Sequence, residues 1–116
     1  MDAWDRTTFY DENRLPWIYP SPNMPMVETA VIYPGMCLIE GTNISEGRGT
    51  TRPFHLFGAP WINKHSLLSI IRTVAKDNGL AGCIFRPATF EPRFQKHDGD
   101  VCHGIEIIIT ANVQSA

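Results

Sequence analysis

Residues 64–78 read KHSLLSIIRTVAKDN, and they carry the clearest structural signal in the chain. Their apolar side chains follow the i, i+3, i+4, i+7 spacing that gathers them on one face of an α-helix: Leu67, Leu68, Ile70, Ile71, Val74 and Ala75. Asn63 is a suitable N-cap, and Asn78 followed by Gly79 is a suitable C-terminal stop. The segment therefore predicts an amphipathic helix whose apolar face must be buried.

The partner for that face is predicted at residues 105–110, which read IEIIIT. Apolar, mostly β-branched side chains occupy both faces of this segment, as expected for a central strand. Residues 83–86 predict a further strand, which Pro87 should interrupt. One main amphipathic helix packed on a small mixed sheet, with long ordered loops, makes the predicted fold class α+β.

The first 25 residues lack periodicity and are predicted to form an extended arm. They hold four prolines, together with aromatic side chains that would anchor the arm: Trp4, Phe9, Tyr10, Trp17 and Tyr19. Asn23 is expected to cap a short helix that has Pro25 in its first turn and runs through Ala30. A turn at residues 33–35 follows, and then a short strand or a helical turn at residues 36–40.

The composition of the chain excludes several classes of protein. A chain of 116 residues with 43% apolar residues fits a single globular domain spanning residues 1–116. Its net charge of -2 argues against a nucleic-acid surface, and its apolar runs are too short for a membrane span. Residues 1–4 have neither the basic start nor the apolar core of a signal peptide. Of the three cysteines, Cys37 and Cys83 lie in apolar runs and are expected to be buried free thiols.

A polar, glycine-rich segment at residues 40–52, EGTNISEGRGTTR, lies between two apolar segments and is the strongest candidate for a functional site. We call it the glycine loop. Its glycines permit backbone conformations closed to other residues and would let a ligand approach the main chain. Its spacing does not match the known phosphate-binding loops. The alternative is a surface loop whose charged side chains pair with one another.

Two glutamates and two arginines would carry the chemistry of the glycine loop. Glu40 and Glu46 are candidate proton donors, proton acceptors or hydroxyl-binding groups. The structural alternative is that Glu40 holds loop amides and that Glu46 pairs with an arginine. Arg48 and Arg52 present forks of donors suited to a carboxylate or phosphate, unless they pair with the two glutamates. Three further side chains would order the loop or contact a ligand: Asn43, Thr50 and Thr51.

A second polar cluster follows the glycine loop in the sequence. It contains Lys96, His97, Asp98, Asp100 and His103, but this spacing matches no standard metal site, and no metal is expected. His103 precedes the predicted central strand and would face the glycine loop as a hydrogen-bond donor. The remaining histidines are expected to be structural or surface residues: His55 and His65.

The glycine loop and its flanks resemble one known family. The matching segments lie at residues 15–17 (LPW), 20–25 (PSPNMP), 33–35 (YPG), 37–43, 45–54, 58–61 (GAPW), 85–87 (FRP), 90–92 (FEP), 96 and 102–104 (CHG). They span nearly the whole chain. The pattern is similar to the C-terminal portion of the exo-β-N-acetylmuramidase (NamZ-like) family, formerly known only as a domain of unknown function.

The resemblance implies an activity and a cellular location. Members of this family are secreted or periplasmic bacterial hydrolases that release terminal N-acetylmuramic acid from the non-reducing end of peptidoglycan fragments. They are longer than this chain, and their N-terminal Rossmann-like domain, for which this sequence has no βαβ pattern, is an expected partner. The chain is expected to be the C-terminal region of such a glycosidase and to be poorly active alone. The alternative is a non-catalytic module that binds glycan or supports a site housed elsewhere.

The resemblance also implies roles for the glycine loop, which would form one wall of the sugar site without a cofactor. Glu40 and Glu46 are the candidate catalytic residues, because most glycosidases use two carboxyl groups. Arg48 and Arg52 would bind the lactyl carboxylate that distinguishes N-acetylmuramic acid from N-acetylglucosamine. The other expected substrate-binding residues are Asn43, Thr50, Thr51 and His103. Two tryptophans would stack on a sugar face or, more commonly for this residue, lie in the core: Trp17 and Trp61.

Overall fold

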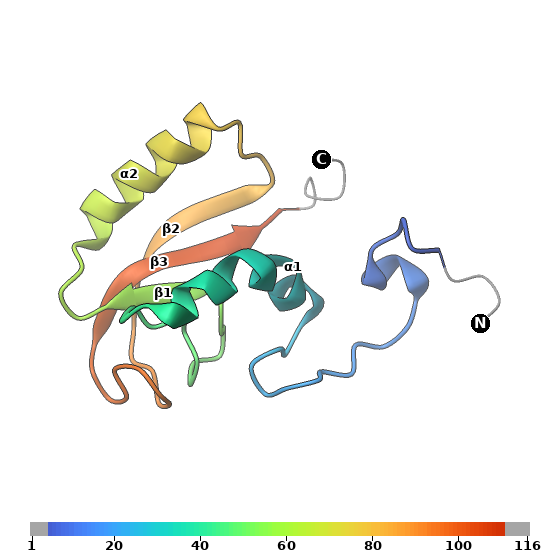
Figure 1. Cartoon of the computed structure of the whole chain (residues 1–116), viewed down its shortest axis with the longest axis horizontal. Coiled ribbons are helices and arrows are strands. Elements are labelled where there is room, and N and C mark those ends of the chain that lie inside the picture. The colour runs from blue at the N-terminus through green and yellow to red at the C-terminus, as the bar shows by residue number, and fades with distance from the viewer. Residues whose placement is uncertain (1–4, 111–116) are drawn as a thin grey trace.

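The computed structural model describes residues 5–110, and Figure 1 shows a small sheet flanked by two α-helices. Within these residues the elements are, in order, a 3-10 helix at Tyr10–Asn13, α1 at Val27–Met36, a 3-10 helix at Cys37–Gly41, β1 at Leu56–Ala59, α2 at Lys64–Asp77, β2 at Cys83–Phe90 and β3 at Cys102–Ile109. The predicted α+β class is confirmed. Trp4, an expected anchor of the arm, and the rest of residues 1–4 lie outside the described part of the chain.

Strand β3 is the central strand, as predicted. Among residues 5–110 the sheet order is β1-β3-β2, and both pairings are antiparallel, so the mixed strand directions expected from the sequence are wrong. Strand β2 also continues through Pro87, which pairs with Ile105. The expected interruption does not occur because an outer strand needs ladder hydrogen bonds on one side only.

Helix α2 confirms the helix predicted from residues 64–78. The Asn63 side chain accepts hydrogen bonds from the backbone N–H groups of His65 and Ser66, each at 3.1 Å, and so acts as the predicted N-cap. The chain leaves the helix through Gly79, whose φ of +63° lies in the left-handed region that favours glycine. Both predicted ends of the helix are therefore confirmed.

The sheet covers part of the predicted apolar face of α2. The helix lies along β2 and contacts β2 and β3 (Figure 1). Leu68 and Ala75 are buried, whereas Ile70 and Val74 remain 61% and 50% exposed. The stripe is therefore wider than the surface that the sheet buries.

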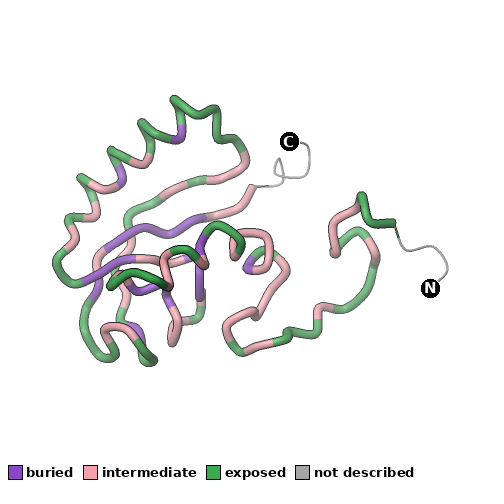
Figure 2. Tube along the Cα trace, viewed as in Figure 1, coloured by how far each residue is buried: buried purple, intermediate pink, exposed green. Residues whose placement is uncertain are grey.

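The hydrophobic core lies between α1 and the sheet, and Figure 2 shows buried residues running along β3. Met36, Phe54 and Ile107 form its buried centre. Tyr33 of α1 meets Phe54 edge-to-face, with ring centroids 4.9 Å apart. Half-buried side chains complete the packing: Met24, Ile32, Tyr33, Ile39, Phe57, Cys83 and Phe85.

Helix α1 begins and ends later than the sequence predicts. It runs to Met36, past the expected end at Ala30, and it includes Pro34, which was expected to form a turn. Proline removes one helical hydrogen bond, but the burial of Met36 and the ring contact of Tyr33 favour continuation. The next five residues form a 3-10 helix, which confirms the helical alternative for residues 36–40.

The N-terminal arm runs away from the sheet (Figure 1). The Trp17 indole N–H donates to the Met24 carbonyl at 3.0 Å, and Tyr10 packs edge-on against Trp17 at 5.2 Å.

The cysteines also differ from expectation, because Cys37 and Cys83 are half-buried. Across residues 5–110, no helix has both the length and the apolar character needed to cross a membrane.

Candidate functional site

The glycine loop is hydrogen-bonded to the outer side of β1. The Ser45 N–H donates to the Gly58 carbonyl at 2.9 Å, and the Gly58 N–H donates to the Ser45 carbonyl at 3.0 Å. The Phe54 N–H then donates to the Glu46 carbonyl at 2.7 Å. The sheet and the core residue Phe54 therefore fix the backbone around Glu46.

The protein's own backbone packs against two glycines of this loop. Gly47 has a φ of +77°, and a Cβ atom there would lie 2.7 Å from the Leu56 carbonyl oxygen. Gly49 has a φ of +76°, and a Cβ atom there would overlap the backbone of Arg93 and Phe94. At these two positions the need for glycine comes from folding, whereas the sequence suggested the close approach of a ligand.

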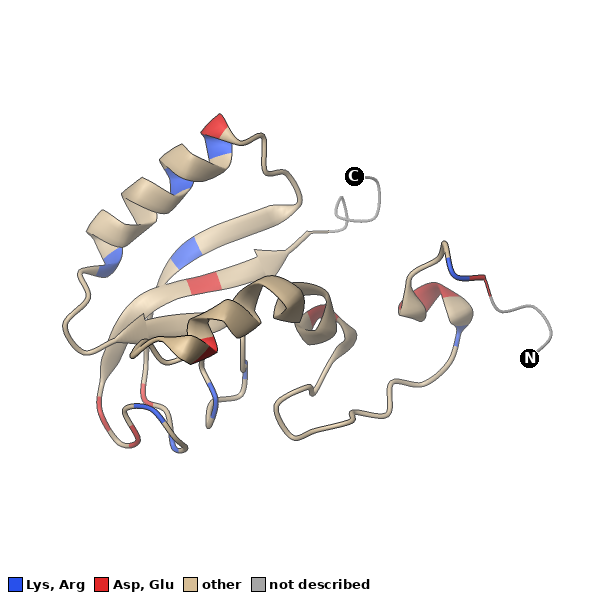
Figure 3. Cartoon of the chain, viewed as in Figure 1, with Lys and Arg blue, Asp and Glu red and all other residues tan. Residues whose placement is uncertain are grey.

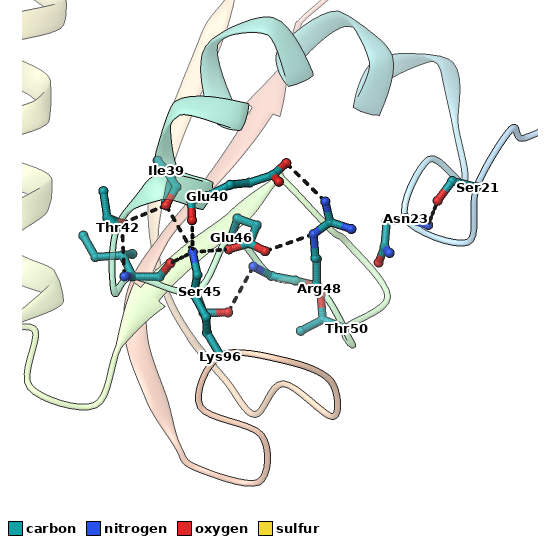
Figure 4. Close-up of polar contacts among 12 residues, drawn as sticks. Ser21, Asn23, Ile39, Glu40, Thr42, Ser45, Glu46, Arg48, Thr50 and Lys96 are labelled. Carbon is teal, nitrogen blue, oxygen red and sulfur yellow. Dashed lines mark hydrogen bonds and ion pairs between the residues drawn. The ribbon is translucent and has the colours of Figure 1, made fainter.

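Lys96 joins the loop at residues 91–101 to the glycine loop. Its Nζ donates to the carbonyl oxygens of Ile39, Glu40 and Ile44 at 3.2, 3.0 and 3.1 Å. It also donates to Glu46 Oε2 at 2.9 Å, so one of its three N–H groups is shared between two of these four acceptors. Figure 4 shows this amine in the middle of the glycine loop, where it holds the loop closed around a buried carboxylate.

Arg48 occupies the other side of Glu46. Its Nε lies 3.0 Å from Glu46 Oε1, and a terminal nitrogen lies 3.1 Å from Glu40 Oε1 (Figure 4). The Nε–H is not aligned for a hydrogen bond, so that contact is an ion pair by distance alone. The guanidinium also lies over the Phe54 ring, 5.1 Å from its centroid. The expected pairing of Arg48 with the glutamates is therefore present.

Exposure separates the two glutamates that the sequence singled out. The Glu46 side chain is 2% exposed, whereas the Glu40 side chain is 35% exposed. The Glu40 side chain is therefore partly open to a ligand in solvent, although its Oε1 is buried against Arg48. Contact with Glu46 would require Lys96 or Arg48 to move. We call the four side chains Glu40, Glu46, Arg48 and Lys96 the Lys96 network.

Arg52 belongs to a different group of charges. Its Nε lies 3.0 Å from Glu106 Oε1 on β3, and Arg86 Nε donates to Glu106 Oε2 at 2.6 Å. The expected pairing of Arg52 with Glu40 or Glu46 is replaced by this one. Glu106 is 6% exposed, while the two arginines are 38% and 61% exposed. Two cations on one carboxylate leave a net positive charge at this part of the sheet.

His55 is a buried structural histidine, as one of the sequence-based alternatives held. Its Nδ1 lies 3.0 Å from the Ile107 carbonyl oxygen, a contact that requires a proton on Nδ1. Its Nε2 lies 3.3 Å from the Thr29 hydroxyl group, which then donates to it. Burial lowers the pKa of His55 from its ordinary value of 6.5, although the bond to Ile107 opposes the shift and nearby Arg52 adds to it. Its neutral form therefore joins α1 to β3.

The other expected binding residues divide between two places. The Asn43 carbonyl accepts a hydrogen bond from His97 Nε2 at 2.8 Å. The Thr50 hydroxyl donates to the Gly47 carbonyl at 2.6 Å, so Thr50 orders the loop, and Thr51 is exposed. His103 Nδ1 lies 3.3 Å from the Thr89 hydroxyl group of β2, on the opposite side of β3 from β1.

Sequence patterns indicate a polar role for Lys96 but not its partners, and they do not single out Glu106 as a site residue. Lys96 falls in the second polar cluster of the sequence, but its partner Glu46 is 50 residues away and no local pattern joins them. Glu106 interrupts an apolar strand, and that interruption is a usable signal for a paired buried carboxylate.

Figure 3 shows charges of both signs in the loops at one end of the sheet. In the described part of the chain, no three His, Cys, Asp or Glu side chains gather closely enough to hold a metal ion.

Comparison with known proteins gives consistent matches. Residues 31–115 match the family model described as exo-beta-N-acetylmuramidase NamZ, C-terminal. Peptidoglycan beta-N-acetylmuramidase NamZ of Bacillus subtilis (strain 168) is 49% identical over 110 residues, which are 95% of this chain and 26% of the relative. The crystal structure of a DUF1343 family protein from Bacteroides fragilis NCTC 9343 superposes with a TM-score of 0.80 at 29% identity, over 97% of this chain and 29% of that one. The chain spans about a quarter of the length of the curated relative.

Proposed function

The chain belongs to the family of C-terminal regions of the exo-β-N-acetylmuramidase NamZ, and from this premise we propose that it forms one wall of the sugar site in a peptidoglycan-processing glycosidase. The reaction would release terminal N-acetylmuramic acid. Because the chain matches only 26% of the Bacillus subtilis relative, the proposal gives it one part of a site that an N-terminal Rossmann-like domain completes. Peptidoglycan lies outside the cytoplasmic membrane, so the proposed place of action is periplasmic or extracellular.

The observation that carries this proposal is the pair that Glu40 and Arg48 present at the surface of the Lys96 network. The two side chains are 35% and 20% exposed and lie 3.1 Å apart. A carboxylate accepts hydrogen bonds from sugar hydroxyl groups, and a guanidinium donates to a carboxylate. The pair therefore offers both kinds of contact to a sugar that carries hydroxyl groups and a lactyl carboxylate.

The buried half of the network would hold this pair in place. Glu46 has both carboxylate oxygens in ion pairs, one with Arg48 and one with Lys96. Charges held by buried partners lose little freedom when a ligand binds, which favours affinity. A catalytic role for Glu46 stays a prediction. We propose that Glu40 is the carboxylate of this chain that touches the sugar, and that a second carboxyl group comes from the rest of the protein.

A test uses arginine variants in the full-length protein. Calorimetric titration should show that Arg48→Ala weakens binding of N-acetylmuramic acid by about 1.5–3 kcal/mol, the scale of a charge-assisted hydrogen bond. N-acetylglucosamine, which lacks the lactyl group, should bind the variant and the parent equally. Arg52→Ala is the matched variant, because Arg52 pairs with Glu106 outside the network. An equal loss for both sugars in Arg48→Ala would mean that Arg48 only braces the loop.

The divided site makes a further prediction for the chain of 116 residues. It should release no nitrophenol from 4-nitrophenyl N-acetylmuraminide under conditions in which the full-length relative turns the substrate over. Turnover at a comparable rate would contradict the divided site. Affinity for N-acetylmuramic acid without turnover, and unaffected by Arg48→Ala, would favour a glycan-binding module that uses another surface.

A further inference from the structure

An exposed tryptophan lies outside the Lys96 network. Trp61 stands between β1 and α2 and is 60% exposed, so the core position that is common for tryptophan does not apply. Its ring meets the His97 ring edge-on, with centroids 5.1 Å apart and an angle of 78° between the planes. An edge-on contact covers at most one face of an indole. With 60% of the residue exposed, much of the indole stays accessible to solvent beside this contact.

The loop at residues 91–101 brings His97 into contact with this tryptophan. His97 has a φ of +59°, and its carbonyl accepts a hydrogen bond from the Asp100 N–H at 2.9 Å. Its Nε2 donates to the Asn43 carbonyl in the glycine loop at 2.8 Å. Trp61 therefore contacts, through His97, the loop that carries the proposed sugar wall.

Hydrogen-bonding side chains from three elements lie at the same end of the sheet. Lys64, three residues after Trp61, donates from Nζ to the Thr89 hydroxyl group at 2.6 Å. The Thr89 hydroxyl oxygen lies 3.3 Å from His103 Nδ1, and His103 pairs in register with Ala59. When Lys64 donates to Thr89, the Thr89 proton can point toward Nδ1. His103 then presents its Nε2–H as a donor.

An exposed aromatic ring at the same end of the sheet as hydrogen-bonding groups matches the chemistry of a sugar ring. The C–H face of a pyranose packs on an indole, while its hydroxyl and acetamido groups need donors and acceptors. We propose that Trp61, with Lys64, Thr89 and His103, binds a second saccharide unit, an N-acetylhexosamine adjacent to the N-acetylmuramic acid. The identity of this glycan rests on the proposed function. A protein partner is the less favoured occupant, because the side chain in ring contact with Trp61 is polar and the charged Lys64 follows three residues later.

The test compares two sugars and two exposed aromatic residues. N,N′-diacetylchitobiose serves as the probe of the second subsite and N-acetylmuramic acid as the probe of the first, both titrated into the full-length protein. Trp61→Ala should lower the affinity for chitobiose at least tenfold and leave that for N-acetylmuramic acid unchanged, whereas Trp61→Phe should retain most of it. Tyr19→Ala is the control, since Tyr19 is a 62% exposed aromatic residue in the arm. His103→Gln should weaken chitobiose binding about threefold without changing the melting temperature.

The outcomes separate this inference from the proposed function. Equal chitobiose affinity in Trp61→Ala and parent, or no chitobiose binding by the parent, would overturn the second subsite. Loss of stability or activity in Trp61→Ala with unchanged chitobiose affinity would also overturn it and indicate a protein contact. If Arg48→Ala fails to affect N-acetylmuramic acid while Trp61→Ala abolishes chitobiose binding, the sugar wall is wrong and the second subsite stands.

Discussion

Lys96→Met tests whether the Lys96 network holds the glycine loop together. Methionine keeps much of the length and the apolar stem of lysine but removes the charge and the donors. The variant would leave the carbonyls of Ile39, Glu40 and Ile44 without this donor. It would also leave the buried Glu46 carboxylate with Arg48 as its remaining ion-pair partner. We expect a lower free energy of unfolding and a mobile glycine loop.

The size of the loss follows from burial. Removing one partner of a fully buried ion pair costs about 3–5 kcal/mol. Glu46 is 2% exposed, but Lys96 is 25% exposed, so solvent screens part of the interaction. We therefore expect a loss of about 2–4 kcal/mol, discounted from that range. For a domain of this size, a loss of about 3 kcal/mol lowers the melting temperature by roughly 10 °C.

Urea unfolding followed by circular dichroism measures the loss. Lys76→Met is the control, because Lys76 lies on the exposed side of the last turn of α2 and should change stability by less than about 0.5 kcal/mol. Glu46→Gln completes a double-mutant cycle with Lys96→Met. If the two side chains act as a pair, the double variant should lose less unfolding free energy than the two single variants lose together. We expect this difference to be about 1–3 kcal/mol. A Lys96→Met loss no larger than that of Lys76→Met would refute the reasoning.

Three further predictions concern the loop, a histidine and a thiol. Gly49→Ala should lower the free energy of unfolding by about 1–3 kcal/mol, because φ is +76° and the new Cβ atom would overlap neighbouring backbone. Gly41→Ala is the control, because no atom lies within 4 Å of its new Cβ atom. It should change stability little in the same urea titration. Because burial lowers the pKa of His55, the unfolded chain binds more protons below pH 6.5, so stability should fall as the pH drops below that value. Thermal unfolding measured from pH 7.5 to 5 should show this loss of stability, and His55→Gln should make the loss smaller. If His55→Gln leaves the pH dependence unchanged, other groups cause it and the prediction is wrong. Cys102 is buried, and burial raises the pKa of its thiol, so a disulfide reagent should modify Cys102 only after the protein unfolds. Mass spectrometry measures the modification. If Cys102 of the native protein reacted as fast as Cys37, the burial would be contradicted.

Sequence patterns within a short segment were sufficient to predict helix α2 and the central strand β3. The stripe from Leu67 to Ala75 and the cap at Asn63 predicted α2, and the apolar run at residues 105–110 predicted the central strand. Pro34 and Pro87 misled the prediction, because local propensity disfavours proline in either element. Packing around Met36 and the outer position of β2 in the sheet made both acceptable.

The candidate site depended on contacts between distant segments. The pairing of Arg48 with Glu40 and Glu46 joins near neighbours and was one of the alternatives that the sequence offered. The bonds from Lys96 and the pairing of Arg52 with Glu106 span about 50 residues each. Such pairings follow from how the strands register, which the sequence alone did not fix. Exposure of Trp61 is likewise a property of the assembled fold.

Pro87 in β2 bears on how this protein behaves at high concentration. An outer strand can pair with an outer strand of another molecule, and this is a common route to aggregation. Proline offers no N–H to such a strand, and Arg86, with a side chain that is 61% exposed, places a charge beside it. Edge-to-edge association through β2 is therefore disfavoured. The residue that obscured the strand in the sequence helps to keep separate copies of the chain apart.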